Sequence, residues 1–265
     1  MASITVLVHG ALGKMGQEVL AAVCRAPDLE PIGGVDKGAT EDYMPLPDDS
    51  GRIPLSPYME NFLAALKPQV MVDFTDADAS IAGCRVAADH GVNLVVGTTG
   101  HTKATIREID RLTREHDIGA FLAPNFAIGA VLLMHLAKGL GKFFDYADIV
   151  EMHHEAKIDS PSGTALALAR NLRDGRDESF TRTSPKTEPV EGTRGGEMGG
   201  VSIHSVRMPG RMAHHEVLLG TQGQTLSLRH DTINRECYMP GVILAIREVV
   251  KSKGLVVGLE KLLGL

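Results

Sequence analysis

Residues 4–16 are ITVLVHGALGKMG, an apolar run followed at once by three regularly spaced glycines. The run Ile4–Val8 is typical of a buried strand, and Met15, Val19 and Leu20 continue at the spacing of a helix. A strand, a glycine turn and a helix in this order place backbone amides at a helix N-terminus, where they can bind a pyrophosphate. The sequence therefore opens with a candidate dinucleotide-binding turn.

The turn has the pattern G-x-x-G-x-x-G, with Ala11 where the commoner G-x-G-x-x-G pattern has a glycine. Asp36 follows the next apolar run and lies 20 residues beyond Gly16 (36 − 16), the distance at which an acidic side chain binds the adenosine ribose. Lys37 can pair with the additional phosphate of NADP, whereas Asp36 favours the free hydroxyl of NAD. The pair therefore leaves both NADPH and NADH as candidate cofactors, against the alternative of a tight turn without a ligand.

The alternation of apolar runs and helical patterns continues to about residue 125. It predicts a parallel sheet with crossover helices. We expect strands at 29–35, 69–74, 92–96 and 118–122, and helices at 77–90 and 102–117. Residues 97–100 and 123–126 follow two of these strands, at the sheet edge where open α/β folds bind their ligands.

Beyond residue 125 the pattern is typical of an α+β region. We expect helices at 126–140 and 162–173, a strand at 147–153 and a long mobile loop at 174–200. Three segments with period-two alternation, 201–208, 212–219 and 224–230, predict an antiparallel sheet. An apolar helical stripe at 240–251 is expected to return and cover the first sheet.

Composition narrows the class of protein. The 265 residues carry a net charge of −6, which gives no general attraction to nucleic acid or acidic membranes. Three scattered cysteines without a CxxC pair fit a reducing cytoplasm, and no apolar stretch approaches the roughly 20 residues that a bilayer span needs. We therefore expect a folded cytoplasmic protein with a small-molecule partner.

Residues 151–164, EMHHEAKIDSPSGT, bring acid, base and anion-binding groups together. We expect Ser160 to cap a helix that begins at Pro161, which leaves the amides of residues 162–164 free for an anion. Lys157 and the two histidines come just before this turn, so a substrate held there by its carboxylate would have cationic or proton-donating groups close by, which indicates reduction with protonation. Because adjacent histidines on a strand face opposite ways and no metal-ligand spacing is present, we expect no metal site.

These motifs together resemble the dihydrodipicolinate reductase family of bacterial and plant lysine biosynthesis, which reduces 4-hydroxy-tetrahydrodipicolinate after its dehydration. The resemblance spans nearly the whole chain and is most specific at residues 153–164. It implies a Rossmann-type dinucleotide-binding domain at 1–125, completed by 236–265, and an α+β domain at 126–235 that binds substrate and forms a homotetramer. The implied reaction is hydride transfer from NADPH or NADH to tetrahydrodipicolinate's cyclic dicarboxylate precursor.

The resemblance also implies roles for individual residues. His153 and Lys157 supply protons, and the substrate is held by His154, Ser162, Gly163 and Thr164. The dinucleotide is held by Gly10, Ala11, Leu12, Gly13, Lys14, Met15, Gly16, Asp36, Lys37, Gly97, Thr98, Thr99, Ala123, Pro124, Asn125 and Phe126.

Two other functions stay open on the sequence alone. One is a different two-domain dehydrogenase, such as a relative of homoserine or aspartate dehydrogenase. The other is a nucleotide-binding sensor without turnover. The His-His-x-x-Lys and Ser-Gly-Thr segments argue against both.

Overall fold

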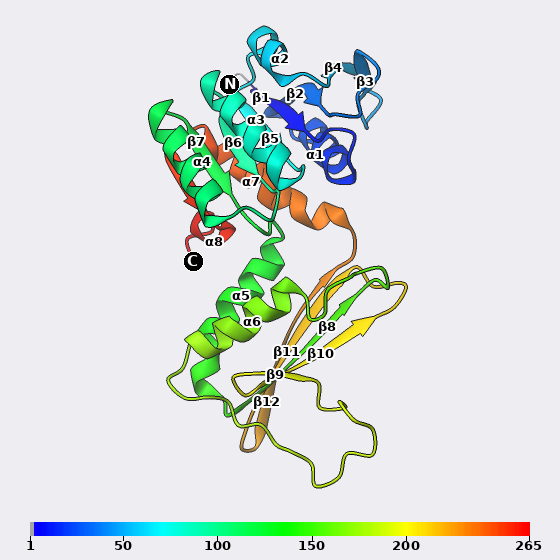
Figure 1. The fold of residues 1–265 in the computed structure, drawn as a ribbon, viewed down its shortest axis with the longest axis vertical. Coiled ribbons are helices and arrows are strands. Elements are labelled where there is room, and N and C mark those ends of the chain that lie inside the picture. The colour runs from blue at the N-terminus through cyan, green and yellow to red at the C-terminus, as the bar shows by residue number, and fades with distance from the viewer. Residues whose placement is uncertain (1–2) are drawn as a thin grey trace. The chain divides into compact units, whose positions relative to one another are not determined.

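The computed structural model describes residues 3–265, and its internal contacts divide the chain into two units (Figure 1). Unit 1 contains the chain up to Ile128 together with Arg235–Leu265, and unit 2 contains Gly129–Asn234. The C-terminal segment therefore returns to the unit in which the chain begins. In the part of the chain that the structure describes, none of the helices has the length and apolar character needed to cross a membrane.

Unit 1 is built on an eight-stranded sheet with the order β13-β7-β6-β5-β1-β2-β4-β3, parallel except for the pair β3–β4. Its strands are β1 (Ile4–His9), β2 (Leu29–Val35), β3 (Tyr43–Pro45), β4 (Arg52–Ser56), β5 (Val70–Asp73), β6 (Asn93–Val96), β7 (Gly119–Leu122) and β13 (Gly254–Val257). Its helices are α1 (Lys14–Arg25), α2 (Met59–Leu66), α3 (Ala77–Asp89), α4 (Lys103–Glu115), α7 (Met239–Val249), α8 (Leu259–Leu262) and the 3₁₀ turn η2 (Arg235–Tyr238).

The central strands of unit 1 are apolar along nearly their whole length because helices cover both faces of the sheet. Helix α7 packs on α1 and on strands β5 to β7, while α3 packs between α2 and α4 (Figure 1). Side chains cap two of the crossover helices: Asp76 accepts from the amide of Ala79, and Thr102 accepts from that of Thr105. The predicted parallel sheet and the covering helix at 240–251 are therefore confirmed.

Unit 2 has a five-stranded sheet in the order β12-β11-β8-β10-β9. Its strands are β8 (Tyr146–His153), β9 (Gly196–Met198), β10 (Val201–Arg207), β11 (Ala213–Thr221) and β12 (Gln224–Thr232). Its helices are α5 (Ile128–Leu140), η1 (Gly141–Phe143) and α6 (Gly163–Asp174). Alternate side chains of β8, among them Ile149, pack with Leu168 and Leu172 of α6 to form the core.

The sheet of this unit is mainly antiparallel, as predicted, because three of its four strand pairings are antiparallel. The segments at 201–208 and 212–219 are not neighbours in it, because β8 lies between β10 and β11 and pairs with β10 in parallel. Period-two alternation identifies a strand and its buried face, but it carries no information about the neighbouring strand. The segment 174–200, predicted as loop throughout, contains β9 and the buried Phe180.

Candidate active site

The glycine turn of unit 1 is closed by a backbone approach that only glycine permits. Gly10 has a φ of +84°, and a Cβ there would lie 2.6 Å from the carbonyl oxygen of Phe74. A Cβ on Gly16 would lie 2.1 Å from the carbonyl oxygen of Gly10. Helix α1 begins directly after Gly13, which offers no side-chain cap, so the first amides of the helix stay available to a ligand. The turn therefore has the form of a phosphate cradle.

Asp36 connects the end of β2 to this turn. Its carboxylate accepts hydrogen bonds from the backbone amides of Leu12 (3.0 Å) and Gly38 (2.9 Å). The neighbouring Lys37 has a side chain that is 89% exposed, and its Nζ lies 3.5 Å from Asp76. A cavity of about 330 Å³ is lined by His9, Gly10, Gly13, Asp36, Lys37, Phe74, Thr75, Asp76 and Ala79. The predicted pair of residues at 36 and 37 thus lies beside the glycine turn in one cavity.

A buried polar network under the sheet edge was missed by sequence reasoning. The fully buried Asp73, at the end of β5, accepts from Thr98 Oγ1 (2.7 Å) and Thr75 Oγ1 (2.8 Å) and lies 2.8 Å from Nδ1 of His9. Burial opposes ionisation, but the contacts with His9, Ser80 and Thr98 outweigh it and hold the pKa of Asp73 below its ordinary value. The sequence feature that could have indicated this network is Asp73 itself, a single acidic residue at the end of an apolar strand.

The two predicted loops lie next to each other, after the neighbouring parallel strands β6 and β7. Thr98 is buried and its hydroxyl is used within the protein, since it also accepts from the amide of Thr75 (2.7 Å). Phe126 is buried with its ring 6.0 Å from that of Phe74, and the side chain of Asn125 accepts from the amide of Ala127. The remaining predicted positions divide by exposure: Leu12, Lys14, Thr99 and Pro124 are exposed, Met15 and Gly97 are half-buried, and Ala11 and Ala123 are buried.

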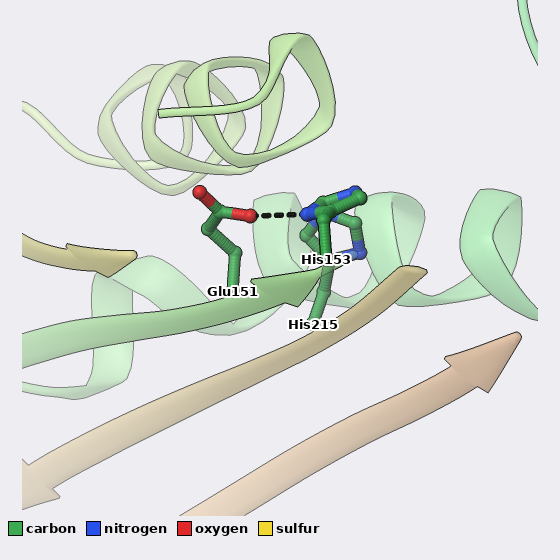
Figure 2. A group of neighbouring side chains, drawn as sticks. All are labelled: Glu151, His153 and His215. Carbon is green, nitrogen blue, oxygen red and sulfur yellow. Dashed lines mark hydrogen bonds and ion pairs between the residues drawn. The ribbon is translucent and has the colours of Figure 1, made fainter. Parts of the chain in front are cut away.

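Unit 2 gathers the chemical groups at the end of β8. Alternation along this strand turns Glu151 and His153 to the buried face, and His154 follows the strand in an exposed position. Nδ1 of His153 is hydrogen-bonded to Glu151 Oε2, and Arg207 of β10 donates to Glu151 Oε1 (2.8 Å). His215 of β11 completes the group, with its ring edge toward His153 and the centroids 5.3 Å apart (Figure 2).

The protonation states of this group follow from burial and charge. Burial lowers the pKa of His153, and the hydrogen bond that the ring donates to Glu151 offsets only part of that effect. Burial lowers the pKa of His215 to about 4, with the nearby His153 acting in the same direction. The pKa of Glu151 is lowered because its contacts with Arg207, Ser205 and His153 outweigh burial. The structure thus favours an ionised carboxylate beside two neutral imidazoles at pH 7.

Lys157 lies on the loop after β8, with its Nζ 2.7 Å from a carboxylate oxygen of Asp159. This ion pair holds the pKa of Asp159 below its usual range. Arg207 donates to the backbone carbonyl of Asp159 (2.7 Å) as well as to Glu151. The guanidinium of Arg207 therefore connects the loop that carries Lys157 with Glu151, the hydrogen-bond partner of His153.

The start of α6 differs from the prediction. The N-cap is Ser162, whose hydroxyl accepts from the amide of Ala165 (3.2 Å), and the helix begins at Gly163 rather than at Pro161. Ser162 has the extended backbone of an N-cap and a hydroxyl that reaches this third amide, so the predicted cap at Ser160 is wrong. The free amides at this helix terminus are then those of Gly163 and Thr164.

The hydroxyl of Ser162 also lies 3.1 Å from Nε2 of His215, and both side chains are buried. Gly163 is exposed, and a Cβ there would have no atom within 4 Å. The helix terminus therefore presents two amides beside open space.

Glu151, His153 and His215 have potential ligand atoms within 4.8 Å of one another. The carboxylate is already paired with the guanidinium of Arg207, and His215 is already bonded to Ser162. A fixed cation at 2.8 Å from the carboxylate opposes a second cation there. Each of the three residues is thus already hydrogen-bonded within the protein, Glu151 to His153 and Arg207 and His215 to Ser162.

A Rossmann-type unit with a glycine turn, joined to an α+β unit with a histidine, a lysine and a helix N-terminus, defines the class of two-domain oxidoreductases. Family models for the N-terminus and the C-terminus of dihydrodipicolinate reductase match residues 4–126 and 129–263. The chain belongs to the dihydrodipicolinate reductase family.

Individual relatives agree with this assignment. A 4-hydroxy-tetrahydrodipicolinate reductase of Dehalococcoides mccartyi is 51% identical over 265 residues, covering 100% of both chains. The corresponding enzyme of Moorella thermoacetica is 42% identical over 267 residues, covering 99% of each. Dipicolinate-bound dihydrodipicolinate reductase from Paenisporosarcina sp. TG-14 superposes with a TM-score of 0.86 at 36% identity, covering 98% of this chain and 99% of that one.

More distant structures share the fold alone, among them amine dehydrogenase from Mycobacterium smegmatis at 14% identity and a TM-score of 0.65. The comparisons confirm the resemblance, the α/β fold class with a second α+β unit, and the reductase activity in lysine and diaminopimelate biosynthesis.

Proposed function

We propose that the chain reduces the dehydrated form of 4-hydroxy-tetrahydrodipicolinate to tetrahydrodipicolinate with NADPH or NADH. In this proposal residues 1–125 and 236–265 bind the dinucleotide, and residues 126–235 bind the cyclic dicarboxylate and form the homotetramer. The observation that carries it is the single network in which Arg207 connects the loop of Lys157 with Glu151 and His153. The cytoplasmic location stays a prediction from the scattered cysteines, and the tetramer stays a prediction from the family resemblance.

The residues of unit 1 fit a dinucleotide. The close backbone approach at Gly10 and Gly16 leaves room for a pyrophosphate only if both positions lack a Cβ. Asp36 is held at the cavity by two amides, and the exposed Lys37 is available to a phosphate. When bound, the nicotinamide supplies the hydride for a ring carbon conjugated with the C=N group. We expect Lys37→Ala to raise KM for NADPH by roughly tenfold relative to KM for NADH.

The residues of unit 2 fit a dicarboxylate whose ring must also gain a proton. We assign one carboxylate to Lys157 and His154, and the other to the cap region at Ser162 and the amides of Gly163 and Thr164. Because Lys157 pairs with Asp159, a substrate carboxylate must compete with that acid for the ammonium. His153 and Lys157 are the proposed donors of the single proton that balances the hydride on the reduced ring. Dipicolinate, which the Paenisporosarcina enzyme binds, is a suitable probe for this site.

The test is oxidation of NADPH and NADH, followed side by side, with the substrate generated in place by the preceding synthase. Lys157→Ala should lose most of the oxidation and the dipicolinate affinity while keeping dinucleotide affinity. Lys138→Ala, an exposed lysine on α5, is the matched control and should leave all three unchanged. Oxidation that persists in Lys157→Ala contradicts the assigned role, and dinucleotide binding without oxidation by the parent chain contradicts the reductase itself.

A further inference from the structure

We propose that Glu151, held by Arg207, is a positioning residue that fixes which nitrogen of His153 exchanges a proton with the substrate. The proposal rests on the role assigned to His153 above. Neither the family models nor the named relatives assign a role to Glu151 or Arg207.

Glu151 is placed by the strand, not by a loop. It lies two residues before His153 on β8, so both side chains point to the same face of the sheet. In the parallel pairing of β8 with β10, Ser205 lies opposite Glu151 and Arg207 lies opposite His153. The register of two strands therefore sets the geometry of the carboxylate, the guanidinium and the imidazole.

The carboxylate of Glu151 has no exposed surface. One oxygen is bonded to His153 Nδ1 and the other to Arg207 Nη2. A buried carboxylate is costly unless charged partners and hydrogen bonds compensate it, and an apolar side chain would pack at this position without that cost. Its two oxygens instead connect the guanidinium of Arg207 with His153, and Figure 2 shows the contact with the histidine.

A carboxylate at Nδ1 requires the hydrogen of the neutral ring to lie on Nδ1. Nε2 is then the nitrogen that takes up a further proton and delivers it. This arrangement resembles the way a buried acid orients the histidine of a catalytic triad. Glu151 therefore acts through His153 and does not touch the substrate.

The charged and titratable groups around His153 come from three strands and one loop. Burial disfavours the imidazolium, as do Lys157 from the loop and Arg207 from β10, whereas the neighbouring His215 of β11 is neutral at pH 7. Among the charged groups that the structure describes around this ring, Glu151 alone favours it. Glu151 thereby keeps the doubly protonated ring accessible at a pH where burial alone would exclude it.

Arg207 extends the effect to the second proposed proton donor. Besides its bond to Glu151, it donates to the carbonyl oxygens of Val206 (2.8 Å) and Asp159 (2.7 Å). Asp159 is in turn the ion partner of Lys157. The guanidinium fork therefore sets the position of Glu151 and of the loop that carries Lys157.

The test combines the pH dependence of kcat with ¹⁵N NMR of the His153 ring. In Glu151→Gln, the high-pH limb of the kcat profile should move to lower pH, and kcat at pH 8 should fall by roughly tenfold or more. The Nδ1–H signal of His153 should be weakened or lost, while dinucleotide affinity in unit 1 stays unchanged. Glu151→Asp should recover part of the profile. Glu216→Gln on β11, also an acid paired with an arginine, is the control and should leave the profile in place.

Arg207→Lys keeps the charge without the fork and should shift the limb in the same direction by a smaller amount. If Glu151→Gln does not fold, this variant decides the question. An unmoved limb together with an unchanged ring tautomer overturns the proposal. His153→Gln distinguishes failure of the proposed function from failure of the positioning role. Full turnover in His153→Gln would refute the role of His153 itself. Lost turnover in His153→Gln, together with an unmoved high-pH limb of the kcat profile in Glu151→Gln, would refute only the positioning role of Glu151.

Discussion

The buried imidazole of His215 makes the folded chain sensitive to acid. Its pKa is lowered to about 4 in the folded state because burial disfavours the charged ring, whereas an exposed histidine titrates at about 6.5. Between these values the unfolded chain binds more protons than the folded chain, so stability falls as the pH drops from about 6.5 to about 4. The loss attributable to this residue reaches about 3 kcal/mol.

Denaturant unfolding of the parent chain and of His215→Gln across this pH range measures the effect. The variant should show a shallower pH dependence, although its stability at pH 7 is lower because the contact with Ser162 changes. His135→Gln, on an exposed face of α5, is the control and should retain the parent slope. Equal slopes for the parent chain and His215→Gln would show that this imidazole is not the acid-sensitive group.

Thr98 gives a second test of a single side chain. Thr98→Val removes the hydroxyl that donates to Asp73 and accepts from the amide of Thr75, so the buried carboxylate loses one of its hydrogen bonds and the amide loses its side-chain acceptor. We expect a loss of about 1–3 kcal/mol in the free energy of unfolding. Thr98→Ser keeps the hydroxyl and should lose less than half of that. A calorimetric comparison in which valine and serine behave alike would contradict the network.

At the scale of single residues, the sequence indicated which functional side chains lie together better than it indicated which groups they contact. The residue types at 153 and 157 identified a cluster that the structure joins through one network. The hydroxyls of Thr98 and Ser162 were predicted to bind ligands, but Asp73 and His215 contact them, from 25 and 53 positions away in the chain. A motif shows which residues share a loop, and it cannot show a buried partner that folding brings from elsewhere.

At the scale of helices and strands, the corrected start of α6 can be tested by comparing the stability of two alanine variants. Ser162→Ala should destabilise the chain by about 1–2 kcal/mol, because it removes the N-cap bond to Ala165 and the contact with His215. Ser160→Ala, at the position predicted from sequence, should change stability by less than about 0.5 kcal/mol. Chemical denaturation of both variants decides between the two starts, and the reverse ranking would restore Ser160 as the cap.

Strand order was the part of the fold that local patterns could not supply. Parallel strands with crossover helices were predicted in unit 1 because each connection is short and each apolar run is followed by its helix. In unit 2, β8 precedes α6 and the segment 174–200 in the chain, yet it lies between β10 and β11. That placement depends on pairing across more than fifty residues, which alternation along one strand does not encode.

At the scale of the whole molecule, unit 1 depends on the end of the chain. Val242, Ile246 and Val249 of α7 are completely buried, and β13 pairs with the edge of β7. Arg247 adds a two-pronged ion pair with Asp28, near the start of the chain. Burial of such side chains stabilises a fold by roughly 1.5–3 kcal/mol each. The three together contribute about 5–9 kcal/mol, a large share of the 5–15 kcal/mol by which a domain is usually stable.

A chain that ends at Asn234 should therefore lose the cooperative unfolding of unit 1 and its dinucleotide affinity, even though the glycine turn and Asp36 are intact in its sequence. Unit 2 is a continuous segment with its own core, so its secondary structure should persist in the shortened chain. A chain that lacks only the exposed residues Gly264 and Leu265 is the control and should bind dinucleotide normally. Full dinucleotide affinity in the chain ending at Asn234 would show that the binding turn keeps its geometry with the apolar face of β5–β7 open to water. In that case α7 and β13 would cover the sheet without stabilising it.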